Sequence, residues 1–136
     1  MLSTDSLGLF RKILLCLDGS EYSERPLQSV ARLARMSGGS VTLLTVCSPP
    51  IAHDAPLATA GHLALLREQL EQLGVPCCSR VAFGKNADTI LEVAREEGCD
   101  LIVLSSHGRQ GRDRFWLGSV AESVMRGTNR TTLIWR

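Results

Sequence analysis

The amino-acid sequence predicts an α/β fold, a three-layer sandwich with a five-stranded, open, parallel sheet and helices on both faces. Three observations lead to this fold class. Five short β-prone runs alternate with four amphipathic segments, a glycine follows each amphipathic segment, and three of the β-prone runs are almost wholly apolar. Apolar runs of that kind are typical of central strands buried on both faces. The alternating order then requires crossover connections and a doubly covered sheet.

The expected strands are identified by apolar and β-branched runs. Residues 12–17 (KILLCL), 41–46 (VTLLTV) and 101–104 (LIVL) are expected at the centre of the sheet. Residues 75–81 are more mixed, which suits an edge strand. Thr131–Trp135 (TTLIW) is the fifth β-prone run.

Each expected helix carries an apolar stripe at helical spacing. The stripes span residues 27–34, 63–73, 87–94 and 121–125. Pro26 fits the first turn of the first helix. Left-handed cap residues are expected at the glycines that follow, which are Gly38, Gly74, Gly98 and Gly127. Residues 47–61 contain three prolines and are expected to form a surface loop able to cover a ligand.

Length, charge and cysteine content limit the class of protein. A chain of 136 residues suits one domain, and we expect a short leader over residues 1–10 and the α/β domain over residues 11–136. A net charge of +1 argues against nucleic-acid binding. No apolar run approaches the ~20 residues of a membrane helix, and no signal peptide is recognisable. Five cysteines without C-x-x-C spacing favour reduced thiols and a cytoplasmic protein.

A ligand of an open parallel sheet binds beyond the carboxyl ends of the strands, where the strand order reverses. The first strand leads to Asp18, the second ends at Val46, and the fourth ends at Leu104 and Ser105. Two roles, compatible with each other, stay open for Asp18. Its carboxylate accepts hydrogen bonds from a ribose or from adenine-side groups, or it caps the first helix or fixes the turn through Gly19.

The segment from Ser105 to Ser119 joins a buried strand to a helix N-terminus, which is a typical anion site. Gly108 and Gly118 stand at the two ends of its loop, where a side chain would block a close anion, although turn geometry alone also explains them. Ser119 begins an S-x-x-E sequence, which predicts a capping box with this serine as the N-cap. His107 has no second histidine or cysteine at ligand spacing, so no metal site is expected.

Catalytic signatures are missing from the sequence. It contains no G-x-S-x-G elbow, no G-x-x-x-x-G-K-[ST] loop and no G-x-G-x-x-G fingerprint. A Ser–His–Asp triad drawn from Asp18, Ser105 or Ser106 and His107 would need a geometry that adjacent residues do not ensure. We therefore assign no catalytic residue, and a hydrolase or nucleotidyl-type enzyme is the weakest of the alternatives.

The residues resemble the universal stress protein family over nearly the whole chain. The resemblance is carried by KILLCLDGSEYSERPLQSVARLA, VTLLTV, GKNADTILEVAREEGCDLIVLSSHGR and LGSVAESVMR. The nucleotide signature of that family is G-x-x-G, nine residues, then G-[ST]. Here Ser105-Ser106-His107-Gly108 is followed by nine residues and then by Gly118-Ser119. The spacing is intact, and Ser105 stands in place of the first glycine.

The resemblance implies a Rossmann-like fold of the adenine nucleotide α-hydrolase type and an ATP-binding stress-response or signalling module with little or no hydrolysis. AMP or ADP is the alternative nucleotide, and Mg²⁺ is expected with it. By position, Asp18 would lie near the ribose and adenine, Val46 would offer its backbone to adenine, and Leu104 would line the base pocket. The phosphates would be held by Gly108, Gly118, Ser119 and Val120. Ser105 would either crowd the nucleotide or donate a hydrogen bond to it.

The same resemblance implies a homodimer in which the last strands, Thr131–Trp135, pair with each other. The sequence is consistent with this, because pairing would cover an otherwise exposed strand edge. The alternative from another class is a nucleotide-independent dimeric interaction module of the same fold. Ser105 and the bulky Phe115-Trp116 pair modestly favour that alternative.

Overall fold

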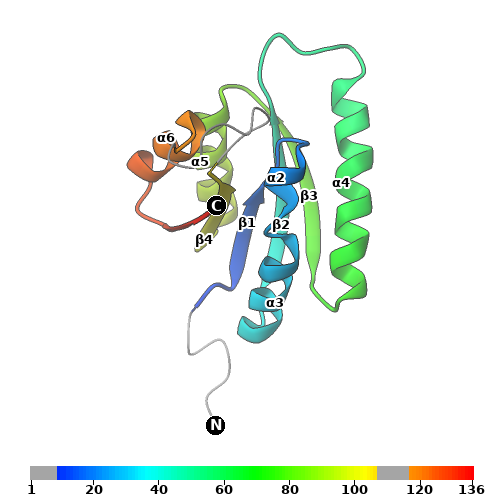
Figure 1. The fold of residues 1–136 in the computed structure, drawn as a ribbon, viewed down its shortest axis with the longest axis vertical. Coiled ribbons are helices and arrows are strands. Elements are labelled where there is room, and N and C mark those ends of the chain that lie inside the picture. Colours follow the sequence, from blue (N-terminus) through cyan, green and yellow to red (C-terminus); the bar gives the residue numbers. More distant parts are fainter. Residues whose placement is uncertain (1–8, 107–116) are drawn as a thin grey trace.

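The computed structural model describes residues 9–106 and 117–136 and has the predicted three-layer α/β architecture (Figure 1). Within these residues five parallel strands form one sheet in the order β3-β2-β1-β4-β5. The strands are β1 (Lys12–Cys16), β2 (Ser40–Cys47), β3 (Cys77–Phe83), β4 (Leu101–Ser105) and β5 (Thr131–Trp135). The helices are α2 (Glu21–Glu24), α3 (Leu27–Ser37), α4 (Ala55–Gln72), α5 (Asn86–Glu97) and α6 (Ser119–Gly127). The predicted fold class is confirmed.

The strand order reverses at β1. This strand pairs with β2 on one side, with Ile13 opposite Val41, and with β4 on the other, with Ile13 opposite Leu101. The chain therefore builds β2 and β3 outward in one direction and β4 and β5 in the other. The carboxyl ends of β1 and β4 flank the switch point, where ligands of such sheets bind.

Two apolar cores lie on opposite faces of the sheet, which explains why the central strands are continuously apolar. Along β1, Ile13 and Leu15 belong to the core beneath α3 and α4, whereas Leu14 and Cys16 belong to the core beneath α5 and α6. Successive side chains of a strand point to opposite faces, so every position of this central strand after Lys12 is buried. Figure 1 shows α4 along the β2 and β3 side of the sheet, against which it packs.

The predicted loop over residues 47–61 is wrong in its second half, because α4 begins at Ala55. Pro56 lies in the first turn of α4, where backbone N–H groups lack intrahelical partners and proline is tolerated. The residues after it are rich in alanine and leucine, which are strong helix formers. The non-helical connection is therefore limited to residues 48–54.

The left-handed glycines after the helices are confirmed at three positions and wrong at one. Gly74 follows the C-cap of α4 with a φ of 82°. Gly38 and Gly98 end α3 and α5 in the left-handed conformation, with φ of 70° and 63°. Gly127, however, is the last residue of α6, and the cap after it is Thr128 in an extended conformation. A Cβ at Gly127 would lie 2.6 Å from Cδ1 of Leu91, so the glycine allows α6 to approach α5 closely.

In the described parts of the chain no helix is both long and apolar enough to cross a membrane. All five cysteines are free thiols. Burial raises the pKa of the Cys16 thiol far above its ordinary range, and nearby Cys99 raises it further. Cys16 is therefore a neutral, apolar part of the core rather than a nucleophile.

Candidate functional site

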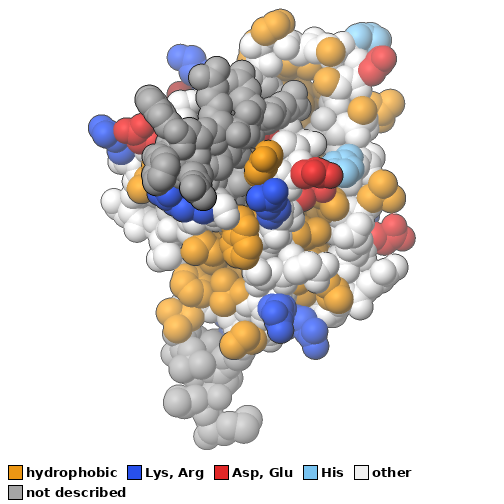
Figure 2. Space-filling model, in the orientation of Figure 1, with side chains coloured by type: hydrophobic (Ala, Val, Ile, Leu, Met, Phe, Trp, Pro, Cys, Tyr) orange, Lys and Arg blue, Asp and Glu red, His pale blue; other side chains and the backbone are white. Residues whose placement is uncertain are grey.

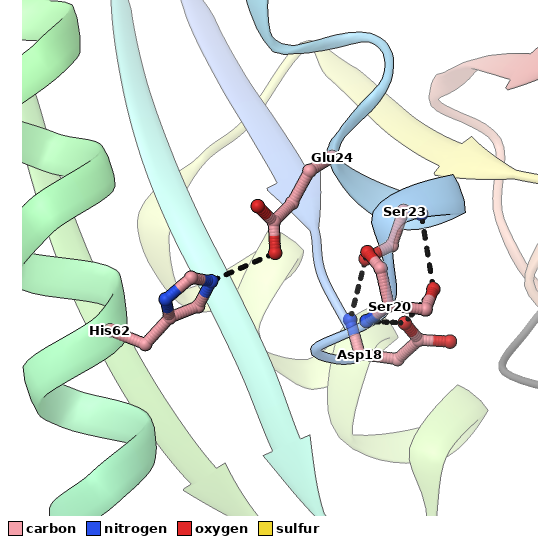
Figure 3. Close-up of polar contacts among 5 residues, drawn as sticks. All are labelled: Asp18, Ser20, Ser23, Glu24 and His62. Carbon is pink, nitrogen blue, oxygen red and sulfur yellow. Dashed lines mark hydrogen bonds and ion pairs between the residues drawn. The ribbon is translucent and has the colours of Figure 1, made fainter.

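The turn after β1 is fixed by the carboxylate of Asp18 (Figure 3). Its Oδ1 accepts hydrogen bonds from the backbone N–H of Ser20 at 2.9 Å and from the Ser20 hydroxyl at 2.6 Å. Gly19 between them has a φ of 89°, a conformation that favours glycine. Asp18 therefore fixes the turn, and the side chain that caps α2 is that of Ser20.

Two serines complete this turn, and sequence reasoning missed both. Ser20 Oγ accepts from the backbone N–H of Ser23 at 3.2 Å and so caps α2. The Ser23 side chain is buried, donates to the Ser20 carbonyl at 2.8 Å, and accepts from the backbone N–H of Asp18 at 3.2 Å. The S-x-x-S spacing was the available signal, because an N-cap serine bonds the amide three residues later.

The backbone of Val46 faces the space beyond the end of β1. The Leu44 carbonyl points toward β1, since it accepts from the N–H of Leu17 at 2.8 Å. The Cys47 carbonyl points the other way, toward β3, since it accepts from Gly84 at 3.1 Å. Alternate residues of a strand direct their backbone groups to the same side. The polar groups of Val46 therefore point where Leu44 does, past the last paired residues of β1 and β2.

At the end of β4, Leu104 is buried in the core beneath α5 and α6, and Ser105 is half-buried opposite Trp135 of β5. Val46 packs partly buried against the same core. Because β1 lies between β2 and β4, the ends of these three strands bring Asp18, Val46 and Ser105 to one edge of the sheet.

The N-terminus of α6 is attached to this edge through the backbone. Gly118 N–H donates to the Ser106 carbonyl at 2.8 Å, and a Cβ on Gly118 would lie only 2.9 Å from that oxygen. Gly118 has a φ of −60°, so its glycine is required by close approach and not by a left-handed turn. Ser119 is exposed and Val120 is half-buried in the first turn of α6.

The predicted capping box is wrong. The N-cap of α6 is Gly118, and its carbonyl accepts from the N–H of Glu122 at 3.0 Å. Ser119 is therefore the first helical residue and its side chain does not cap the helix. The Glu122 carboxylate pairs with Arg126 one turn later at 2.9 Å instead of reaching back. The glycine N-cap has no side chain that could cap the helix, and the amides of a first helical turn lack intrahelical partners and can bind an anion.

Ser106 joins β4 to its two neighbours. Its N–H donates to the Trp135 carbonyl at 2.7 Å, and its own carbonyl binds Gly118. The side chain is 2% exposed, and its hydroxyl has no hydrogen-bond partner in the structure as far as it is described. Nothing in the sequence singles out this serine from Ser105, because the difference depends on the tertiary contact with α6.

One expected site residue, Gly108, lies outside the described residues. The same is true of His107 and of the Phe115-Trp116 pair. Among the residues that are described, no group of three or more His, Cys, Asp or Glu side chains converges to hold a metal ion.

Comparison with known proteins gives one consistent result. A model of the universal stress protein family matches residues 9–136. A universal stress protein of Methanocaldococcus jannaschii is 29% identical over 140 residues, which cover 93% of this chain and 82% of that protein. The solved structure of another from the same organism has a TM-score of 0.85 at 25% identity, covering 93% of this chain and 96% of that one. A universal stress protein solved in complex with cAMP has a TM-score of 0.73 at 25% identity, with 92% and 95% covered.

Proposed function

Because this chain belongs to the universal stress protein family, we propose that it is an ATP-binding stress-response or signalling module with little or no hydrolysis. The nucleotide lies at the carboxyl edge of the sheet, and AMP or ADP is the alternative ligand. The observation that carries the proposal is the N-terminus of α6, which begins at a glycine N-cap and is held against β4 by the bond from Gly118 to Ser106. The related structure with bound cAMP supports an adenine nucleotide as the ligand class.

The base and ribose half of the proposed site fits the residues present. Adenine carries both donors and acceptors on one edge, and the backbone of Val46 offers both beyond the end of β1. Leu104 contributes apolar surface near the base. Asp18, half-buried in its braced turn, would accept a hydrogen bond from a ribose hydroxyl.

The phosphate half depends on backbone amides. We assign the phosphates to the first turn of α6, at Gly118, Ser119 and Val120, together with Gly108. A helix N-terminus binds anions through its unpaired N–H groups and its partial positive charge. Mg²⁺ would arrive with a triphosphate, because this ion is usually held by substrate phosphates with few protein ligands.

We further propose a cytoplasmic homodimer that pairs through β5, Thr131–Trp135. Support comes from the position of β5 at the edge of the sheet and from Leu133, a large apolar side chain that is 40% exposed there. Strand edges of this kind are normally covered or paired. The free thiols are typical of a reducing compartment.

The test is the melting temperature with and without Mg-ATP. A ligand that binds the folded state at 100 times its Kd stabilises it by about 2.7 kcal/mol, so the melting temperature must rise. An unchanged melting temperature at about 5 mM Mg-ATP would refute nucleotide binding, since linkage requires a shift. The matched variant is Ser105→Gly, which restores the family signature and should not weaken binding.

Ser105 is also the observation that favours the second candidate, a nucleotide-independent dimeric interaction module. It carries a side chain where the signature has a glycine. If Mg-ATP leaves the melting temperature of wild type unchanged but raises that of Ser105→Gly, the serine closes the site and the second candidate holds. If Mg-ATP raises the melting temperature of both chains equally, the serine is tolerated and the first candidate holds.

A further inference from the structure

We propose that Glu24 and His62 form a pH-sensitive tie that positions the two segments flanking the nucleotide site, so that nucleotide binds more tightly when His62 is protonated. The inference rests on the proposed nucleotide-binding function and adds a regulatory input to it. Both residues are positioning residues, because neither is assigned a contact with the nucleotide.

The tie crosses between two helices that follow neighbouring strands. Nε2 of His62, on α4, lies 2.8 Å from Oε2 of Glu24, on α2 (Figure 3). The α2 helix begins just after the Asp18 turn, and α4 begins nine residues after Val46. The pair therefore joins the segment that continues from β1 to the segment that continues from β2, at the edge where the site is proposed.

The α2 helix depends on such contacts because it is very short. It is a single turn of four residues, and Ser23 is the one buried residue among them. One isolated helical turn is unstable in water, so side-chain contacts must hold it. Ser23 bonds the backbone of Asp18 and Ser20, and the next residue is Glu24. Loss of the Glu24 contact would therefore weaken the hydrogen bonds that Ser23 makes to the Asp18 turn.

His62 has no charged neighbour nearby on its own helix. It is the one titratable residue between Ala55 and Leu66 on α4. On α2 the other carboxylate is Glu21, and Arg25 beyond it lies over the Tyr22 ring, 4.4 Å from the centroid.

The remaining charges of the neighbouring elements lie on α3 and β3. The basic residues of α3 are exposed, and they are Arg32 and Arg35. On β3, Cys77 packs against the core beneath α4, and its charged neighbours are Glu71 and Arg67 at the far end of that helix. The charged residue of β3 itself is Arg80, which pairs with Glu96 and Glu97 of α5. On the face drawn in Figure 2, histidine and acidic side chains lie side by side at the surface. Glu24 is therefore the charged group that the structure places in contact with His62.

The expected effect is modest and has a definite sign. A neutral imidazole still donates one hydrogen bond to the carboxylate, and protonation adds charge to that bond. The side chains of His62 and Glu24 are 47% and 25% exposed, and exposed pairs of this type change an equilibrium by about two- to fivefold. Histidine changes its charge between about pH 5 and 8, so affinity should fall as the pH rises through this range.

The experiment measures Kd for Mg-ATP by calorimetry at about pH 5.5 and about pH 8 in wild type, His62→Gln, Glu24→Gln and the double variant. The quantity compared between chains is the Kd at the higher pH divided by the Kd at the lower pH. Titration of the phosphates and of other histidines contributes equally to this ratio in every chain. Wild type should show a ratio about two- to fivefold larger than His62→Gln. Glu24→Gln should lose the same factor, and the double variant should lose no more. His53→Gln is the control and should keep the wild-type ratio.

Equal ratios in wild type and His62→Gln would overturn the tie while leaving nucleotide binding intact. Absence of binding in wild type at both pH values would instead refute the proposed function, and with it the regulation of that site. A second measurement needs no nucleotide: amide hydrogen exchange over residues 19–25 at about pH 5.5. Exchange there should be faster in His62→Gln than in wild type, and unchanged exchange would overturn the tie.

Discussion

Replacing Gly118 by alanine should destabilise the protein, although it replaces a glycine with a residue that ordinarily favours helices. The added Cβ would lie 2.9 Å from the Ser106 carbonyl oxygen, closer than carbon and oxygen atoms normally pack. The obstacle is backbone at the end of a strand paired on both sides, so it cannot rotate away. The start of α6 must move instead.

The cost follows from two parts of that movement. Overpacking at a well-packed site typically costs about 1–3 kcal/mol. The hydrogen bond from Gly118 N–H to Ser106, 2.8 Å long, would lengthen, and such a bond contributes about 1 kcal/mol. Since the two effects share one displacement, we expect a loss of about 2 kcal/mol in the free energy of unfolding.

Urea denaturation followed by circular dichroism measures this loss, and two further variants sharpen it. Gly118→Ser adds a good N-cap, which alone would stabilise the helix by a few tenths of a kcal/mol. We expect it to destabilise, because serine carries the same Cβ. Gly61→Ala in α4 is the control: nothing lies within 4 Å of its Cβ, so it should stabilise by about 0.4–1 kcal/mol. Neutral or stabilising results for both Gly118 variants would refute the close-approach argument.

Three further predictions concern the core and the thiols. Ser106→Ala should raise the free energy of unfolding by about 1 kcal/mol, because it removes a buried hydroxyl that has no partner among the described residues; a lower urea midpoint would contradict this. Asp100→Ala should lower the melting temperature, with a loss of about 2 kcal/mol, because this carboxylate accepts from the backbone N–H groups of Arg11 and Lys12 at 2.8 and 3.0 Å; an unchanged melting temperature would show that these bonds contribute nothing. A thiol reagent at about pH 8 should modify exposed Cys78 before Cys99. Burial raises the pKa of Cys99 to about 11, so Cys99 should become reactive only as the pH approaches that value. Equal modification rates of the two thiols, measured by mass spectrometry, would disprove this.

The parts of the fold that the sequence predicts well are those set by burial on both faces of a strand. The run from Lys12 to Leu17 is apolar at every position after the first, and only a central parallel strand uses such a run fully. The start of α4 was missed because Pro56 and the prolines before it suggest a loop, while a proline in a first helical turn costs little. The α2 turn was missed because three side-chain hydrogen bonds hold it, and no apolar periodicity marks it.

The candidate site likewise has one part that the sequence predicts and another that it does not. Topology alone brings Asp18, Val46 and Ser105 to one edge, because ends of neighbouring parallel strands lie together. The close backbone approach between Gly118 and Ser106 is a tertiary contact, which sequence spacing does not reveal. The sequence therefore placed the N-cap of α6 at Ser119, one residue too late. The tie between Glu24 and His62 joins residues 38 positions apart, and neither residue belongs to a recognisable motif. Contacts of that kind become visible only when the helices are packed.

The two halves of the proposed site depend on different features, and this difference is testable. The base half uses the backbone of Val46, whose direction is fixed by the β1–β2 register and would survive most substitutions. The phosphate half needs room beside α6, and Ser105 alters the signature on that side only. Adenosine, which lacks phosphates, therefore reports the base half alone. If the phosphate half works, ATP should bind at least tenfold more tightly than adenosine, since a difference of about 1.4 kcal/mol is modest for several charge-assisted bonds. Equal affinities in wild type, with a preference for ATP restored by Ser105→Gly, would show that the serine disables the phosphate half.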